Sequence, residues 1–312
     1  MLATAEVAAP TETIAQARPA RAYLALIGGV MCIGFTAIFT KWAAVPGPAA
    51  AAIRMTLATM LLGGPFAWQL RRRRLPRSGI GPAMLGGLWV GINLGFLNSA
   101  LLMTSAATAT LLDNMAPVWV GLGAMLLLKE RLRTRYWLGL VVALAGAGVV
   151  TGFQPGAVRS INQGDLLAFA GSVFYAGYLL ITQRARRDLD ALSCLWIAVA
   201  TASVSLSLGC LVLHIPLLGY SARSYWALFG AALVSQTGGW LLINYALGYL
   251  PASTAVVILL GQPVVTGLLS IPLLREALAL RQILGGGLVL GGIYQCVKSE
   301  GPSAAVGVAE AE

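Results

Sequence analysis

The sequence predicts an all-α membrane protein of ten transmembrane helices, arranged as two inverted five-helix repeats, and three observations support that fold class. First, 58% of the 312 residues are hydrophobic and only 10% are charged, whereas soluble domains carry about 25% charged residues. Second, ten apolar runs are each long enough for a helix to cross the hydrocarbon core of a bilayer. Third, the two halves of the chain match each other at one fixed offset.

The ten apolar runs are separated by short turns or by charged residues. Helices are expected in them because lipid cannot hydrogen-bond an exposed backbone. The expected spans are residues 22–42, 47–69, 79–103, 105–128, 135–153, 165–185, 191–214, 225–248, 251–273 and 281–298. Two disordered cytoplasmic tails, residues 1–21 and 299–312, are expected to flank them.

The basic residues indicate how the chain is oriented. If the amino terminus is cytoplasmic, about three times as many Lys and Arg residues lie inside as outside, and such an excess is typical of cytoplasmic loops. We therefore expect a multi-pass protein of the bacterial cell inner (plasma) membrane with both termini in the cytoplasm. Because the net charge of +10 sits in short loops and not on one soluble face, nucleic acid is excluded as a partner.

A shift of 146 positions aligns the chain with itself. Asn98 then meets Asn244, Pro117 meets Pro263, and Glu130 meets Glu276, among many matched apolar positions. Matches of Asn, Pro and Glu at one offset are hard to obtain by chance in apolar sequence. The repeats are expected at residues 22–153 and 154–298.

Each repeat holds five spans, and an odd number forces the second repeat to enter the membrane in the opposite orientation. The loop charges agree, since Arg71 to Arg74 follow the second span whereas only Arg223 follows the seventh. Inverted repeats are a common plan of secondary transporters, in which the substrate binds near the membrane midplane between the halves.

Outside the two tails, the chain resembles the ten-helix EamA-type branch of the drug/metabolite transporter superfamily. The motifs that carry the resemblance are Thr104 to Ala109, Pro117-Val118 and Lys129-Glu130-Arg131, with the echoes Pro251 to Ala255, Gln262-Pro263 and Arg275-Glu276. The resemblance implies an exporter of amino acids or other metabolites, similar in kind to the YddG-like amino-acid exporters.

Asp113 is the one carboxylate well inside a span. A charge near the bilayer centre costs about 2.5–3.5 kcal/mol on insertion scales, so this side chain must face protein or water. Arg54 is predicted at a similar depth and is its natural partner. An intramembrane charge pair between Arg54 and Asp113 could gate the protein or simply join two helices.

Two prolines at equivalent positions are predicted to be helix hinges. Proline lacks an N–H, so Pro117 frees the carbonyl of Asp113 and Pro263 frees that of Leu259. The alternative role for each is a kink that serves packing.

Further polar and aromatic residues recur on single helix faces within the spans. Amide and aromatic side chains together suit a wet cavity, although an aromatic stripe also serves packing. With Asp113, the predicted cavity-lining, substrate-binding residues are Trp89, Asn93, Asn114, Tyr175, Tyr178, Gln236, Trp240, Asn244 and Gln262.

These features favour a secondary transporter that exports small metabolites, above all amino acids, by alternating access. Drugs or nucleosides are alternative substrates, and a gated channel is the alternative of a different class. An enzyme is not expected, because one buried acid and one histidine supply no catalytic set. We expect no cofactor and no metal, and we expect a monomer or a weak homo-oligomer in the lipid bilayer with a small-molecule substrate.

Overall fold

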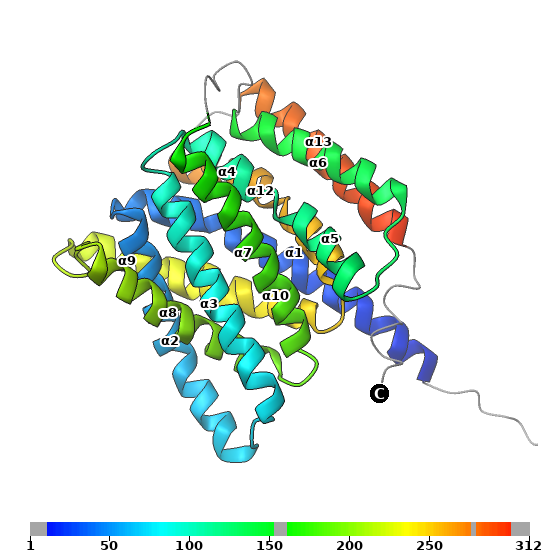
Figure 1. The fold of residues 1–312 in the computed structure, drawn as a ribbon, viewed down its shortest axis with the longest axis horizontal. Helices are drawn as coiled ribbons and strands as arrows, with labels where there is room; N and C mark the ends of the chain where they lie inside the picture. The colour runs from blue at the N-terminus through cyan, green and yellow to red at the C-terminus, as the bar shows by residue number, and fades with distance from the viewer. Residues whose placement is uncertain (1–10, 153–160, 276–278, 301–312) are drawn as a thin grey trace, which may run out of the picture.

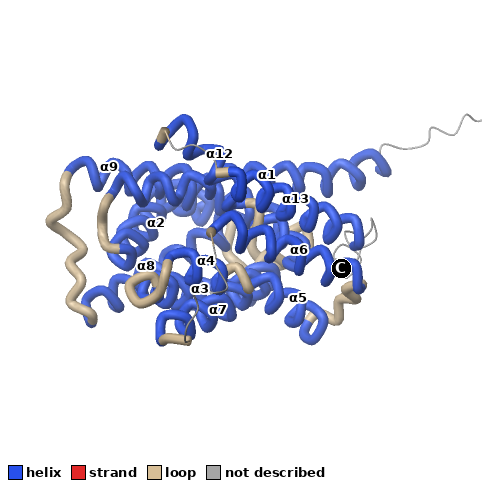
Figure 2. The backbone as a smooth tube through the Cα atoms, turned by 90° about the horizontal axis from the view of Figure 1, so that it is seen from above, coloured by secondary structure: helices blue, strands red, loops and turns tan. Residues whose placement is uncertain are grey.

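The computed structural model describes residues 11–152, 161–275 and 279–300, and every regular element in these ranges is a helix (Figures 1 and 2). The elements are α1 Thr11–Ala43, α2 Gly47–Arg72, α3 Arg77–Ala100, α4 Ala106–Asp113, α5 Ala116–Leu127, α6 Thr134–Thr151, α7 Gln163–Ala185, α8 Ala191–Val212, α9 Ala222–Gly230, the π-helix η2 Ala231–Gly239, α10 Trp240–Leu247, α11 Ala252–Leu259, α12 Gln262–Leu274 and α13 Leu280–Glu300.

Nine helical stretches in the described ranges are long and apolar enough to cross a membrane. They correspond to the first nine expected spans. The tenth expected span, 281–298, is α13, which has 21 residues but carries Arg281 and Gln282 in its first turn. Over its described residues the protein is therefore all-helical, with nine to ten candidate membrane spans.

The amino-terminal boundary differs from the prediction. The helix α1 begins at Thr11, so part of the segment 1–21 that was expected to be disordered is helical. Residues 1–10 and 301–312, where the rest of the two tails was expected, lie outside the described residues. In Figure 1 the beginning of α1 and the end of α13 lie on the same side of the molecule.

Two of the expected spans are interrupted, and a third departs from regular α-helix. The fourth divides into α4 and α5 around Asn114 and Met115, and the ninth divides into α11 and α12 around Leu260 and Gly261. Each break lies just before a proline, where a backbone N–H is missing. The eighth span stays continuous but passes through the π-helix η2, whose wider turns shift the faces that its side chains occupy.

The helices α6 and α13 pack closely and antiparallel through glycines. A Cβ atom on Gly139 would lie 2.8 Å from the carbonyl oxygen of Gly292, and one on Gly146 would lie 2.7 Å from that of Gly285. Small residues allow the two backbones to approach this closely. In lipid, where the hydrophobic effect does not drive helices together, such close packing stabilises their association.

The ends of the bundle can be named by the residues found there. We call the Lys41 end the one where α1 ends, α2 begins, α3 ends and α13 begins. The Glu130 end is the opposite one, where α5 leads into α6, α7 into α8 and α10 into α11.

Candidate functional site: a central polar cavity

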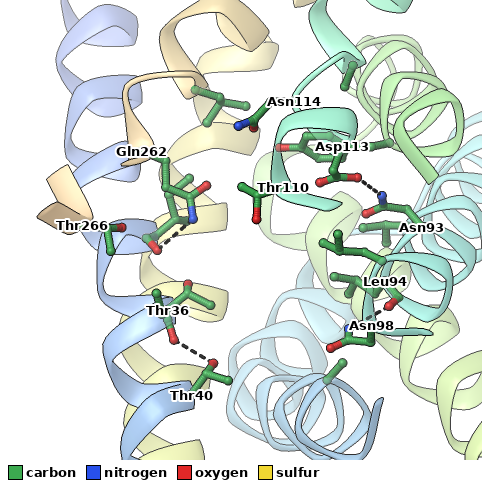
Figure 3. Close-up of a pocket in the computed structure, with 18 of the residues that line it drawn as sticks. Thr36, Thr40, Asn93, Leu94, Asn98, Thr110, Asp113, Asn114, Gln262 and Thr266 are labelled. Carbon is green, nitrogen blue, oxygen red and sulfur yellow. Dashed lines mark hydrogen bonds between the residues drawn. The ribbon is translucent and has the colours of Figure 1, made fainter. Parts of the chain in front are cut away.

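A cavity of about 720 Å³ lies between the two halves of the chain, within the 300–1,000 Å³ that ligand pockets usually have. Its walls come from α1, α2, α3, α4, α5, α7, α8, α11, α12 and α13, together with η2 and α10. It reaches the Lys41 end, where Lys41, Gly47, Leu101 and Gln282 line it. Figure 3 shows Gln262 and Thr266 on one wall and Thr110 and Asp113 on the facing wall.

Asp113 lines the cavity at the end of α4, directly before the helix break. The side-chain amide of Asn93 donates to its Oδ1 at 2.8 Å and also to the carbonyl of Gly171 at 3.0 Å. Asn93 is therefore held between α4 and α7 and fixes one oxygen of the carboxylate (Figure 3). The hydrogen bonds of the described residues give the second oxygen no protein partner.

Arg54 also lines the cavity, but the structure does not contain the predicted Arg54–Asp113 pair. Among the described contacts Asp113 accepts from Asn93, and Nε of Arg54 is buried without a hydrogen-bond partner. The sequence places both residues at similar depth, yet depth alone does not bring two helices' side chains together. Two opposite charges thus share one cavity without touching.

An aromatic and amide cluster lines the deeper part of the cavity. Trp240 of α10 lies 5.3 Å from Tyr178 and 6.3 Å from Tyr175, measured between ring centroids. Gln236 lines the wall from η2, and Gln262 donates weakly to the carbonyl of Ile33 at 3.5 Å. Asn114, Pro117 and Pro263 also line the cavity at the two helix breaks.

Two predicted residues do not line the cavity. Trp89 packs on Phe174 with ring centroids 5.1 Å apart and covers Gly177, where a Cβ would lie 2.0 Å from the indole. Asn244 is 1% exposed and donates to the carbonyl of Trp240 at 3.0 Å. Both share a helical face with cavity residues, but that face continues past the cavity into packed protein.

Sequence reasoning missed several polar residues of the cavity wall. They are Thr36, Thr40, Lys41, Asn98, Thr110, Thr266 and Gln282. The repeat offered a signal for one of them, since Asn98 is the counterpart of Asn244 and makes the equivalent bond to Leu94 at 2.7 Å. Among the described residues Asn98 lines the cavity and Asn244 does not, so the prediction named the member of the pair that lies outside it.

Hydrogen bonds between the two halves close the Glu130 end. Ser253 donates from its hydroxyl to Oε2 of Glu130 at 2.8 Å, and the Tyr136 hydroxyl donates to the Ser253 carbonyl at 3.3 Å. Within the second half, Gln183 of α7 accepts from the backbone N–H of Ala252 of α11 at 3.2 Å. None of these residues lines the cavity.

Burial raises the pKa of Glu130, and the hydrogen bond from Ser253 opposes that rise only in part. Nearby, Arg186 donates from Nε to the Asn244 carbonyl at 2.7 Å and from Nη1 to the Leu189 carbonyl. Its pKa is lowered because it is removed from water. Closure of this end thus depends on polar groups that have given up part of their hydration.

A polytopic helical bundle with a polar cavity that reaches one end is the arrangement of a membrane transport protein. The sequence profile of the EamA-like transporter family matches residues 20–152 and again residues 162–297. The chain belongs to the EamA-like transporter family, within the drug/metabolite transporter superfamily. It is therefore a membrane transporter.

Two curated relatives and one solved structure match this chain over most of its length and over most of their own. An "Uncharacterized transporter" of Archaeoglobus fulgidus is 29% identical over 279 residues, covering 85% of this chain and 94% of its own. The "Uncharacterized transporter YyaM" of Bacillus subtilis is 25% identical over 288 residues, covering 87% and 92%. A crystal structure with 21% identity and a TM-score of 0.73 covers 89% of this chain and 97% of its own, and supports the fold alone.

Proposed function

We propose that this protein exports small metabolites, above all amino acids, across the bacterial inner membrane by alternating access. The observation that carries the proposal is a cavity between the two halves that reaches the Lys41 end, while hydrogen bonds join the halves at the Glu130 end. A carrier needs such a one-sided state and its mirror state, with the binding site between them.

We infer that the repeats, residues 22–153 and 154–298, are inverted. Gly139 and Gly146 of α6 have the counterparts Gly285 and Gly292 of α13 at the offset of 146. In the close packing of these helices Gly139 meets Gly292 and Gly146 meets Gly285. This exchange of equivalent partners across an antiparallel pair is what a two-fold axis in the membrane plane produces.

The cavity supports the same axis. Repeat-equivalent positions line it together, as with Leu94 and Trp240 or Pro117 and Pro263. The two helix breaks are equivalent as well, since Asn114 and Leu260 are separated by the same 146 positions. Equivalent residues of both halves can therefore contribute to a binding site on the symmetry axis.

With both termini in the cytoplasm, the Lys41 end faces outward and the Glu130 end faces the cytoplasm. The described conformation is then outward-facing. Rocking of the halves, with bending at Pro117 and Pro263, would open the Glu130 end to receive substrate from the cytoplasm. Export follows when substrate bound from inside is released at the Lys41 end.

Amino acids suit the cavity because its wall offers a carboxylate, a guanidinium and several amides within one space. A zwitterion presents charges of both signs and donors as well as acceptors. Drugs of purely apolar character would leave these polar groups without partners, which costs affinity.

Counterflow in proteoliposomes tests the proposal. Purified full-length protein is reconstituted with an unlabelled solute inside, and labelled amino acids, nucleosides and cationic drugs are offered outside. We expect transient accumulation of labelled amino acid above equilibrium, driven by exchange. Flux without such accumulation would indicate a channel, and accumulation of nucleosides or drugs alone would overturn the proposed substrate.

A further inference from the structure

We infer that Arg54 is the residue that binds the carboxylate of the transported amino acid, with the Asn93-held Asp113 receiving its ammonium group. This inference rests on the proposed function and adds a specificity-determining residue to it. It joins two observations, namely a guanidinium in the cavity wall whose Nε lacks a protein partner and a carboxylate in the same cavity that is already oriented.

Arg54 is placed deep in the cavity by α2. The cavity-lining residues of this helix are Gly47, Ala50, Ala51, Arg54 and Met55, which share one helical face. Arg54 lies seven positions from the start of α2 at Gly47 (54 − 47 = 7), which corresponds to roughly 10 Å of depth from the Lys41 end. A cation at this depth is not a surface group.

Asp113 lines the cavity from α4, at a corresponding position along its helix. It too is seven positions into its helix, because α4 begins at Ala106 (113 − 106 = 7). Its Oδ1 accepts from Asn93, which in turn is anchored on the Gly171 carbonyl. The carboxylate is therefore oriented by the protein, whereas the guanidinium is not.

The two charged groups of the cavity wall do not neutralise each other. Nε of Arg54 is buried without a hydrogen-bond partner, and Arg54 and Asp113 make no ion pair with each other. Buried charges without partners are costly. A ligand that carries a carboxylate and an ammonium on neighbouring atoms satisfies both groups at once.

The guanidinium is suited to this task by geometry. Its fork of N–H donors matches the two oxygens of a carboxylate, and such bidentate bonds are the strong ones. An amino-acid amide has the same size and keeps the ammonium, but its neutral carboxamide cannot neutralise Arg54. The protein should therefore distinguish an amino acid from its own amide, and Arg54 should be responsible.

A purely structural role of Arg54 would lead to a different result for a charge-exchange variant. If Arg54 served to pair with Asp113 in another conformation, exchanging the two residues would preserve the pair. The double variant Arg54→Asp with Asp113→Arg would then regain transport. If Arg54 binds substrate, the double variant should not transport, because the surroundings of positions 54 and 113 differ. Of these two side chains, for example, Asn93 hydrogen-bonds only to the one at position 113.

Competition in the counterflow assay tests the inference with full-length protein. The probe is whichever of the twenty proteinogenic L-amino acids gives the largest counterflow, paired with its own amide as unlabelled competitor. We expect the wild-type protein to prefer the acid over the amide by roughly 10- to 100-fold, as loss of a charge-assisted hydrogen bond implies. Arg54→Gln should reduce that ratio to about threefold or less on the same grounds.

Arg223→Gln is the matched control. Arg223 is an exposed cation near the start of α9 that does not line the cavity, so this variant should keep the wild-type ratio of acid to amide. If Arg54→Gln does not fold, Arg54→Lys keeps the charge and loses the fork. That variant should weaken binding of the acid by about tenfold and leave binding of the amide unchanged, as read from ligand-induced thermal shifts in detergent.

The outcomes separate this inference from the proposed function. If no amino acid gives counterflow in the wild-type protein, the proposed function fails and the inference fails with it. If amino acids are exchanged but Arg54→Gln keeps the wild-type ratio, or the exchanged double variant regains transport, the assignment of Arg54 alone is overturned.

Discussion

The packing of α6 against α13 gives a prediction that two adjacent glycines can test. A Cβ on Gly292 would lie 2.5 Å from the Gly139 carbonyl oxygen and 2.5 Å from the Ala143 backbone nitrogen. Ordinary contact begins at 3.4 Å, so α13 would have to move away by 0.9 Å (3.4 − 2.5). Both obstructing atoms are backbone atoms and cannot rotate aside. A Cβ on Gly291 would meet nothing within 4 Å.

We therefore expect Gly292→Ala to destabilise the protein by about 1–3 kcal/mol, the usual cost of overpacking. Gly291→Ala should be neutral or stabilising by up to about 1 kcal/mol, because alanine favours helix. Thermal unfolding of the purified protein in one detergent measures both variants against the wild-type protein. Equal melting temperatures for the two variants would refute the packing described for these helices.

The two-fold relation between the repeats extends this prediction. Gly146 is the counterpart of Gly292, and a Cβ there would lie 2.6 Å from the backbone nitrogen of Val289. Gly146→Ala should therefore lower the melting temperature by a similar amount. A harmless Gly146→Ala beside a destabilising Gly292→Ala would contradict the equivalence of the two sites.

Three further predictions concern the ends and walls of the cavity. Burial raises the pKa of Glu130 while the Glu130 end is closed, so protonation favours closure, and closure weakens as the pH rises through that raised pKa. Glu130→Gln should therefore abolish this pH dependence of transport. An unchanged pH profile would show that Glu130 does not cause it. Asn93→Ala removes the donor to Asp113 and should weaken substrate binding by about 1.5–3 kcal/mol, as measured by ligand-induced thermal shifts; wild-type affinity would show that the orientation of Asp113 is irrelevant. Pro117→Ala and Pro263→Ala restore an N–H at the two helix breaks and should slow counterflow at saturating substrate without weakening binding, whereas normal turnover would rule out the hinges.

Much of the fold could be predicted because lipid restricts the possibilities to helices of known length. The nine spans found in the described ranges were all expected, and the prolines marked the breaks at Asn114 and Leu260. The π-helix η2 could not be foreseen, because no residue in 231–239 requires it. The early start of α1 was also missed, since Pro19 and the charges around it resemble a tail.

Asp113 and Gln236 are unusual residues inside spans, and both line the cavity. Arg54 was predicted as the partner of Asp113 and lines the same cavity without contacting it. For Trp89 and Asn244 the sequence offered only a helix face, and both are packed into protein. The two matched halves carry the same pattern of residues. The choice between Asn98 and Asn244 therefore could not be made from the repeat.

Thiol accessibility tests the alternating cavity most directly. The assay uses a protein whose four native cysteines are replaced by alanine. Into it we introduce, one at a time, Thr110→Cys in the cavity wall and Ser253→Cys in the closed end. A membrane-impermeant thiol reagent is then applied to oriented vesicles. The account predicts that the thiol at position 110 reacts from the Lys41 side. Under conditions that open the Glu130 end, both introduced thiols should react with reagent from the Glu130 side. The thiol at position 110 should then no longer react from the Lys41 side. Reaction at position 110 from both sides at the same time would contradict the account.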